Sequence, residues 1–155
     1  MNAVDLYRIE HWLWKKRVPI LPQFIHHLIF LMFNSHIPAS CTIGKGTRFA
    51  YGGIGVVIHA NCVIGDDCII GTNVTIGGRS GRIKPPTIGN NIYISTGAKI
   101  LGDIQIDDNV IVGANSVVIK DVPRNAIVVG VPSRIIKYLS FASSFITFSS
   151  LDIAF

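Results

Sequence analysis

Charge is scarce in this chain, and negative charge is the scarcer sign. Only 15% of the 155 residues are charged, while 49% are hydrophobic, so burial dominates the composition. This length provides one domain with a real core and hardly enough for two. Fourteen basic against nine acidic residues give a formal net charge of +5. Without a long basic helix or a groove-reading motif, we do not expect a nucleic-acid partner; a phosphate-bearing cofactor or an anionic membrane surface suits this charge better.

Cysteine is also scarce. Cys41, Cys62 and Cys68 make an odd count without paired spacing, which argues against a disulfide framework and for a reducing compartment. We therefore expect a cytoplasmic protein, with the inner face of the membrane as a further option.

The longest apolar run is too short and too interrupted for a membrane span. It extends from Val18 to Phe33, follows the basic residues 15–17, and contains Pro19 and Pro22. A span needs about 20 apolar residues. We expect residues 1–35 to form a helical hairpin with one strongly apolar face. We favour packing of this face on the rest of the protein over peripheral contact with a membrane.

What the chain has instead is a period of six. Large aliphatic residues recur at this step in one register, and an upstream series of Ile37, Ile43 and Phe49 is offset from it by a three-residue insertion. A period of six is neither the 3.6 of a helix nor the 2 of a lone strand. It predicts a coil of three short strands that each point one large side chain inward. The main series is Ile58, Ile64, Ile70, Ile76, Ile88, Ile94, Ile100, Ile106, Val112 and Val118.

A second set of residues supports this coil. Small or apolar side chains follow the aliphatic positions by four residues, as expected for a second inward position in a narrow interior. All three cysteines belong to this set, so we interpret them as inert core residues and expect no metal site. The set is Cys41, Thr47, Cys62, Cys68, Val74, Ile92, Ala98, Ile104, Val110, Ser116 and Val122.

Glycine and polar turn residues fill the positions between these sets. The residue directly after the aliphatic is often glycine, as at Gly65 and Gly71, which we attribute to a tight bend of the backbone. Pairs such as Asp66-Asp67 and Asn90-Asn91 follow and are typical of solvent-facing turns.

Two insertions interrupt the repeat. One is the glycine-rich stretch Tyr51 to Val57, and the other, Gly78 to Thr87, carries several basic residues. Insertions in repeat proteins usually form loops over a binding face. The predicted organisation is an N-terminal helical segment (1–35), a repeat domain (36–131) and a C-terminal helix or tail (132–155).

Four motifs stand out in this frame: IGTNVTIGG at 70–78, GAKILG at 97–102, GANSVV at 113–118 and GVPSR at 130–134. Together they resemble the serine acetyltransferase branch of the hexapeptide-repeat acyltransferases. The N-terminal segment looks like the short members of this branch, which are often linked to acetylation of bacterial surface polysaccharides. The resemblance covers residues 6–137. It implies a left-handed parallel β-helix that acts as an acetyl-CoA-dependent O-acyltransferase.

The resemblance also implies a homotrimer whose active sites lie in clefts between neighbouring β-helices, with acetyl-CoA along each cleft. The implied cofactor residues are Gly78, Thr96, Gly97 and Ala114 through their backbone, and Lys120 and Arg134 through their side chains. The resemblance assigns Lys120 and Arg134 to the cofactor phosphates, but an ordinary solvent-exposed charge is an equal alternative for both residues.

The chain departs from this family at the acceptor end of the site. Serine acetyltransferases carry an Asp-His pair where this sequence has Ala50-Tyr51, and an aspartate that partners the base aligns with His36. An Arg-His pair that holds the serine carboxylate falls near Lys84. Loss of this clamp favours a sugar hydroxyl over serine as the acceptor. We expect Tyr51, Arg82 and Lys84 to contact the acceptor.

Acyl transfer from a thioester to a hydroxyl needs a base for the hydroxyl proton and donors for the oxyanion. Histidine suits the first role because it titrates near neutrality. His59 holds the outward position that glycine takes in most repeats, directly after the glycine-rich insertion. We predict His59 as the general base, with His36 as the alternative; an exposed structural histidine is the simpler interpretation.

The predicted function is transfer of acetyl from acetyl-CoA to a sugar hydroxyl in bacterial surface polysaccharide synthesis. Serine acetylation for cysteine synthesis is the alternative within the same class, and a non-catalytic β-helix scaffold trimer is the alternative outside it. A β-helix carbonic anhydrase would need three histidines meeting at a zinc ion, whereas the repeats after residue 40 contain only His59.

Overall fold

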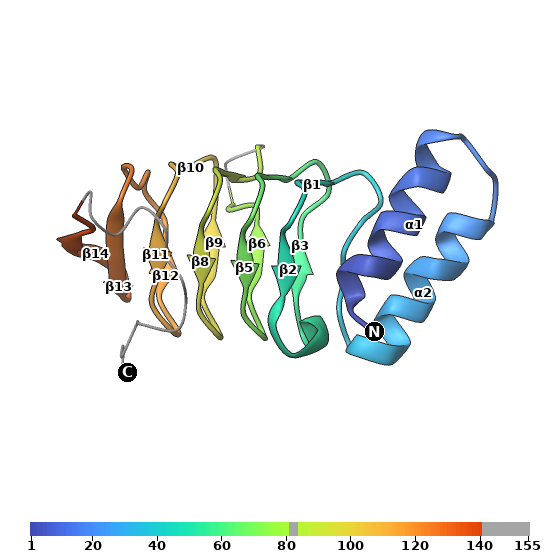
Figure 1. Cartoon of the computed structure of the whole chain (residues 1–155), viewed down its shortest axis with the longest axis horizontal. Helices are drawn as coiled ribbons and strands as arrows, with labels where there is room; N and C mark the ends of the chain where they lie inside the picture. The colour runs from blue at the N-terminus through green and yellow to red at the C-terminus, as the bar shows by residue number, and fades with distance from the viewer. Residues whose placement is uncertain (81–83, 141–155) are drawn as a thin grey trace.

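A two-helix hairpin and a β-solenoid lie end to end in the computed structural model, which describes residues 1–80 and 84–140 (Figure 1). The hairpin consists of α1 (Ala3–Lys15) and α2 (Leu21–Phe33). A short 3-10 turn, η1 (Ala50–Gly53), interrupts the first coil of the solenoid. The predicted left-handed parallel β-helix with an N-terminal helical segment is confirmed, with about four turns.

Consecutive strands go to three different sheets, which is the coil that the six-residue period predicts. The first sheet contains β1 (Thr42–Ile43), β4 (Val63–Ile64), β7 (Thr87–Ile88) and β10 (Gln105–Ile106). The second contains β2 (Arg48–Phe49), β5 (Ile69–Ile70), β8 (Tyr93–Ile94), β11 (Ile111–Val112), β13 (Ala126–Gly130) and β14 (Ser133–Tyr138). The third contains β3 (Val57–Ile58), β6 (Thr75–Gly77), β9 (Lys99–Leu101) and β12 (Val117–Val118).

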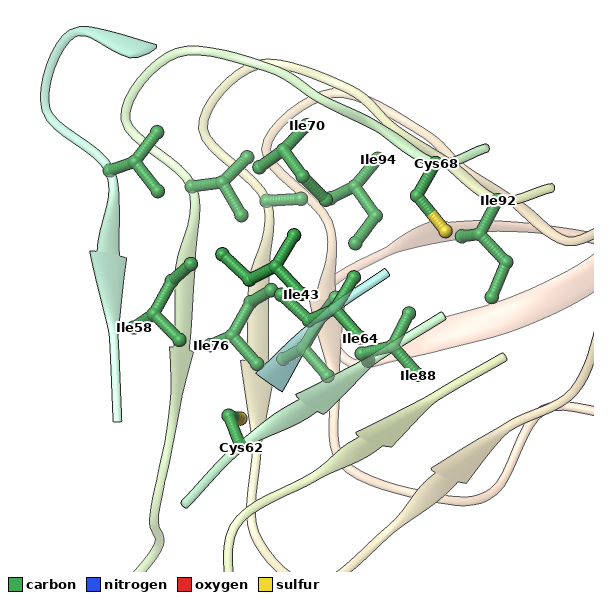
Figure 2. Packing of buried hydrophobic residues seen from close by; sticks show 14 of the residues in the cluster. Ile43, Ile58, Cys62, Ile64, Cys68, Ile70, Ile76, Ile88, Ile92 and Ile94 are labelled. Carbon is green, nitrogen blue, oxygen red and sulfur yellow. The ribbon is translucent and has the colours of Figure 1, made fainter. Parts of the chain in front are cut away.

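Both predicted inward positions are buried. The ten aliphatic residues of the main series are at most 1% exposed, and the eleven of the second set are at most 7% exposed. Neighbouring coils stack like on like: Ile58 pairs with Ile76, and Ile64 pairs with Ile88 (Figure 2). Full burial of such a side chain stabilises the fold by roughly 1.5–3 kcal/mol. The aliphatic stacks therefore contribute strongly to the cohesion between coils.

The three cysteines lie in this core with free thiols. Figure 2 shows Cys62 and Cys68 among the isoleucine side chains. Burial raises the pKa of the Cys41 and Cys62 thiols to about 12, so neither forms a thiolate at neutral pH. The prediction that the cysteines are core residues is confirmed.

The corners of the coil have a recurring backbone conformation that the sequence did not reveal. Residues three positions after the inward aliphatic adopt positive φ, including Asn61, Asp67 and Asn91. Asn and Asp tolerate this left-handed region better than other residues with a side chain. Their side chains also bridge coils: Asn91 Nδ2 donates to Asn109 Oδ1 at 2.8 Å, and Asn109 Nδ2 donates to Asn125 Oδ1 at 3.0 Å.

The glycine after the aliphatic has a different cause from the predicted one. Gly71 has an ordinary φ, but a Cβ there would lie 2.6 Å from the backbone nitrogen of Thr96 in the next coil. Close approach between coils, and not a tight bend, therefore excludes a side chain at this position.

The N-terminal hairpin closes one end of the solenoid. Asn2 caps α1 by accepting a hydrogen bond from the Val4 backbone at 3.2 Å, and Asp5 completes the capping box. Tyr7 on the buried face of α1 donates a hydrogen bond to the Cys41 carbonyl at 2.6 Å, which fixes the helix on the first coil. The predicted hairpin is confirmed, but only part of its apolar surface packs on the coil.

The region after residue 132 differs from the predicted helix or tail. Ser133–Tyr138 form β14, which pairs antiparallel with β13. The last parallel strand would otherwise leave an unpaired backbone edge, and the returning strand covers it. The rest of the predicted tail, residues 141–155, lies outside the described residues.

Candidate active site

The strands of the third sheet begin and end at two corners of the coil. We call the residues directly after these strands the exit corner; it includes 59–60, 78 and 119–120. We call the residues between the second and third sheets the entry corner; it includes 50–56, 71–74, 95–98 and 113–116. The predicted site residues divide between these two corners.

His59 lies at the exit corner of the first coil, with an exposed side chain. Its backbone N–H donates to the Ile76 carbonyl at 2.8 Å, which ties the residue to the second coil. Its Nδ1 lies 2.5 Å from the Ala60 carbonyl oxygen. A carbonyl only accepts, so Nδ1 carries the proton and Nε2 keeps a free lone pair. This is the tautomer that a general base needs.

Gly78 lies beside this lone pair. A Cβ at Gly78 would lie 3.9 Å from His59 Nε2 and 3.8 Å from its Cδ2. The structure therefore brings together the predicted base and one predicted cofactor residue. Lys120 lies at the same corner three coils further along, about 14 Å away at the usual spacing of adjacent strands.

Thr96, Gly97 and Ala114 lie together at the entry corner. The Asn115 backbone N–H donates to the Thr96 carbonyl at 2.9 Å, which stacks the third and fourth coils here. Gly97 has a φ of +76°, and a side chain there would collide with Asn115. The side chains of Thr96 and Ala114 are exposed. Within one chain, this group and His59 stand at opposite ends of the third-sheet strands, so one chain does not bring them together.

The predicted acceptor residues are more scattered. Tyr51 belongs to η1 at the entry corner, is 83% exposed, and has a φ of 50°. A positive φ is unusual for so bulky a residue, so the backbone at Tyr51 is strained. Lys84 is exposed, Arg82 lies outside the described residues, and Arg134 stands on β14 opposite Val129.

A second group of ionisable residues was missed by sequence reasoning. His26 Nε2 lies 3.1 Å from His36 Nδ1, and His26 Nδ1 lies 3.4 Å from Glu10 Oε1. These residues come from α2, from the segment before β1, and from α1, so no spacing rule connects them. His36 bridges to Val57 and so lies beside the third sheet, one coil before His59.

Burial sets the protonation of this group. It raises the pKa of the Glu10 carboxyl from 4.5 to about 7, opposed by a hydrogen bond from the Ala39 backbone. Burial also lowers the pKa of His26, and the neighbouring His36 and His27 lower it further. Glu10 Oε2 is buried without a hydrogen-bond partner among the described residues. Burial therefore opposes the charged forms of both Glu10 and His26.

A hollow on the surface lies apart from these groups. Gln105, Asp107, Asp121, Val122 and Pro123 line it. None of the predicted site residues belongs to this lining, so the hollow does not mark the predicted site.

Known proteins share both the repeat and the fold. Residues 85–120 match the family described as bacterial transferase hexapeptide (six repeats). The serine acetyltransferase of Synechococcus elongatus is 42% identical over 138 residues, which are 87% of this chain and 56% of the relative. That of Staphylococcus epidermidis is 41% identical over 140 residues, which are 88% of this chain and 65% of the relative. The chain thus spans 56% and 65% of the length of these two relatives.

Solved structures give the same result. A serine acetyltransferase of Brucella abortus in complex with coenzyme A has a TM-score of 0.84 and 32% identity, covering 89% of this chain and 56% of that one. A serine acetyltransferase in complex with cysteine has a TM-score of 0.81 and 34% identity, covering 89% and 54%. The coil, its inward register and these relatives agree with the resemblance seen in the sequence: the chain carries the repeat of the hexapeptide acyltransferases and resembles their serine acetyltransferase branch.

Proposed function

We propose that this protein transfers the acetyl group of acetyl-CoA to the hydroxyl of serine. The observation that carries the proposal is the similarity to serine acetyltransferases over 86–89% of the chain, including structures with bound coenzyme A and with cysteine. The sequence alone favoured a sugar acceptor and kept serine as the alternative. The relatives support the alternative.

His59 is the proposed general base. Its Nε2 accepts the proton of the acceptor hydroxyl while the hydroxyl oxygen bonds to the thioester carbonyl carbon. When the carbon–sulfur bond breaks, the same imidazolium returns the proton to the sulfur, which leaves as the thiol. The contact of Nδ1 with the Ala60 carbonyl supports this role, because the same contact stabilises the imidazolium.

A complete site needs a second chain in this proposal. The exit corner of one chain supplies His59 and Gly78, and the entry corner of its neighbour supplies the backbone of Thr96, Gly97 and Ala114 to the cofactor. A homotrimer closes such contacts around a three-fold axis. Lys120 and Arg134 then remain candidates for the cofactor phosphates.

A sugar hydroxyl is the second candidate acceptor. In the resemblance to serine acetyltransferases, Tyr51 falls at the histidine of their Asp-His pair, and their carboxylate clamp falls near Lys84. An exposed phenol and an ammonium group can hydrogen-bond a sugar but provide no bidentate carboxylate contact.

Release of the CoA thiol, followed with a thiol reagent, tests both candidates on the full chain. Serine-dependent release with O-acetylserine as the product, identified by mass spectrometry, would support the proposal. Release that depends on a sugar but not on serine would replace it with the second candidate. Binding of acetyl-CoA without transfer to any acceptor in the panel would favour the non-catalytic scaffold.

A further inference from the structure

The outer face of α2 is apolar although no described residue covers it. α2 is the outermost element at the helical end of the molecule (Figure 1). It buries Ile29 and Phe33 on one side. On the opposite side Leu21, Phe24 and Leu31 recur at helical spacing and are 46%, 65% and 82% exposed. The end cap of a solenoid ordinarily presents a polar outer face, so this face calls for an occupant.

Positive charge surrounds one end of this face. The α1–α2 turn carries Lys15, Lys16 and Arg17, all exposed, next to the start of α2. Acidic residues do not balance them: α2 contains none, and of the two in α1, Asp5 lies in the first turn at the far end and Glu10 is buried.

Aromatic side chains complete the pattern. Trp12 and Trp14, near the end of α1, are 59% and 47% exposed, and Ile20 in the turn is 77% exposed. Tryptophan beside lysine, arginine and large aliphatic side chains is the composition that suits the boundary between headgroups and acyl chains.

We propose that the outer face of α2 and the α1–α2 turn dock on an anionic phospholipid membrane. The apolar side chains of α2 enter the boundary with the acyl chains, and residues 15–17 contact the lipid phosphates. No helix among the described residues is both long and apolar enough to cross a membrane. The contact is therefore peripheral, with α2, about 20 Å long, lying in the plane of the surface.

A second copy of the chain is the competing occupant. If two such faces were in contact, the interface would contain residues 15–17 of both copies. Neither α2 nor the turn has an exposed acidic side chain to compensate these charges. Like charges brought together in this way oppose association, whereas an anionic surface attracts the same cluster. Charge complementarity therefore favours the membrane.

Sedimentation of the full chain with vesicles tests this proposal. We expect binding to phosphatidylcholine vesicles that contain about 30% phosphatidylglycerol, weak binding to pure phosphatidylcholine, and loss of binding at high salt. Replacing Lys15, Lys16 and Arg17 by serine should weaken the partition coefficient roughly 10²-fold. The double variant Phe24→Ser and Leu31→Ser should weaken it at least about tenfold.

Val63→Ser is the matched control, because Val63 is an apolar side chain with 44% exposure on the solenoid. It should leave vesicle binding unchanged, and thermal unfolding should show that every variant is folded. A full-length protein that stays in the supernatant with anionic vesicles at low salt would overturn the proposal. So would a double variant that binds vesicles normally but has a lower mass by light scattering, because the face would then join copies of the chain.

Discussion

At the scale of single residues, His59 combines exposure with a fixed tautomer. The Ala60 carbonyl holds the proton on Nδ1, and Gly78 lies beside Nε2. Among the described residues, the imidazole has no hydrogen bond or ion pair with another ionisable side chain, and it lies outside the aliphatic stacks. Its removal should therefore affect chemistry far more than folding.

Replacement of His59 by alanine should lower the turnover number roughly 10²–10⁴-fold, the usual contribution of a general base. Acetyl-CoA affinity, measured by calorimetry, should barely change, because the proposed cofactor contacts are mostly backbone. The melting temperature should also be retained. His36→Ala is the control and should be milder. Near-normal turnover in the His59 variant, together with a large loss in the His36 variant, would identify His36 as the base.

Glu10 allows a test of stability against pH. Burial raises its pKa from 4.5 to about 7, so the folded protein binds this proton more tightly than the unfolded chain does. The stability that the proton provides is complete below about pH 4.5 and is lost as the pH rises to about 7. The loss amounts to at most roughly 3–4 kcal/mol at 1.36 kcal/mol for each pKa unit.

The variant Glu10→Gln stays uncharged and should therefore escape this loss. Urea unfolding should give similar stabilities for the two proteins below pH 4.5 and a more stable variant at pH 8. If the variant is less stable than the parent at pH 8, an ion pair between Glu10 and His26 outweighs the cost of burial.

At the scale of elements, the strands are too short to be stable singly. Most contain two residues, so each gains its stability from the strands above and below it in the same sheet. Neighbouring coils must therefore approach closely, and the corner glycines make this possible.

Gly71 and Gly77 form a matched pair for testing this. A Cβ at Gly71 would lie 2.6 Å from the Thr96 backbone, whereas at Gly77 the nearest atoms are side-chain methyls at 3.8 and 3.9 Å. Gly71→Ala should cost roughly 1–3 kcal/mol of the unfolding free energy, the usual range for overpacking. Gly77→Ala should be nearly neutral or stabilising by up to about 1 kcal/mol. If the two variants lose equal unfolding free energy in urea, the close approach of the next coil is not what excludes a side chain at Gly71.

At the scale of the whole molecule, the proposed site spans two chains. His59 and the group at Thr96 stand at opposite ends of the third-sheet strands within one chain. We therefore expect a stable trimer at micromolar concentration by light scattering, independent of ligand. A monomer would remove the basis for a site between chains.

Mixed trimers test the shared site directly. His59→Ala removes the proposed base, and Ala114→Trp should block the exposed cofactor corner of the neighbouring chain. Each variant alone should be inactive. After unfolding and refolding together in equal amounts, about a quarter of the contacts should pair two intact halves and restore that share of the activity. No recovery, despite mixed trimers in native mass spectrometry, would place both residues in one chain's own site.

Much of this architecture could be read from the amino-acid sequence alone. The six-residue step is local and repeats in every strand, so the series from Ile58 to Val118 determined which side chains point inward. The same register determined that the cysteines are buried and that His59 is outside the core. A regular repeat leaves the chain little choice, because any other register would expose the whole aliphatic series.

Only the tertiary structure decided the features that depend on contact between unlike elements. Glu10, His26 and His36 meet because two helices dock on the first coil, and no sequence spacing encodes that geometry. Residues 133–138 form a strand because the stacked coils end at β13, whose outer backbone edge would otherwise be unpaired. The separation of the Thr96 group from His59 likewise follows from the order of strands around the coil. A periodic sequence pattern determines which side chains of the repeat point inward. The contacts at the two ends of the solenoid depend on surfaces that form only when the chain has folded.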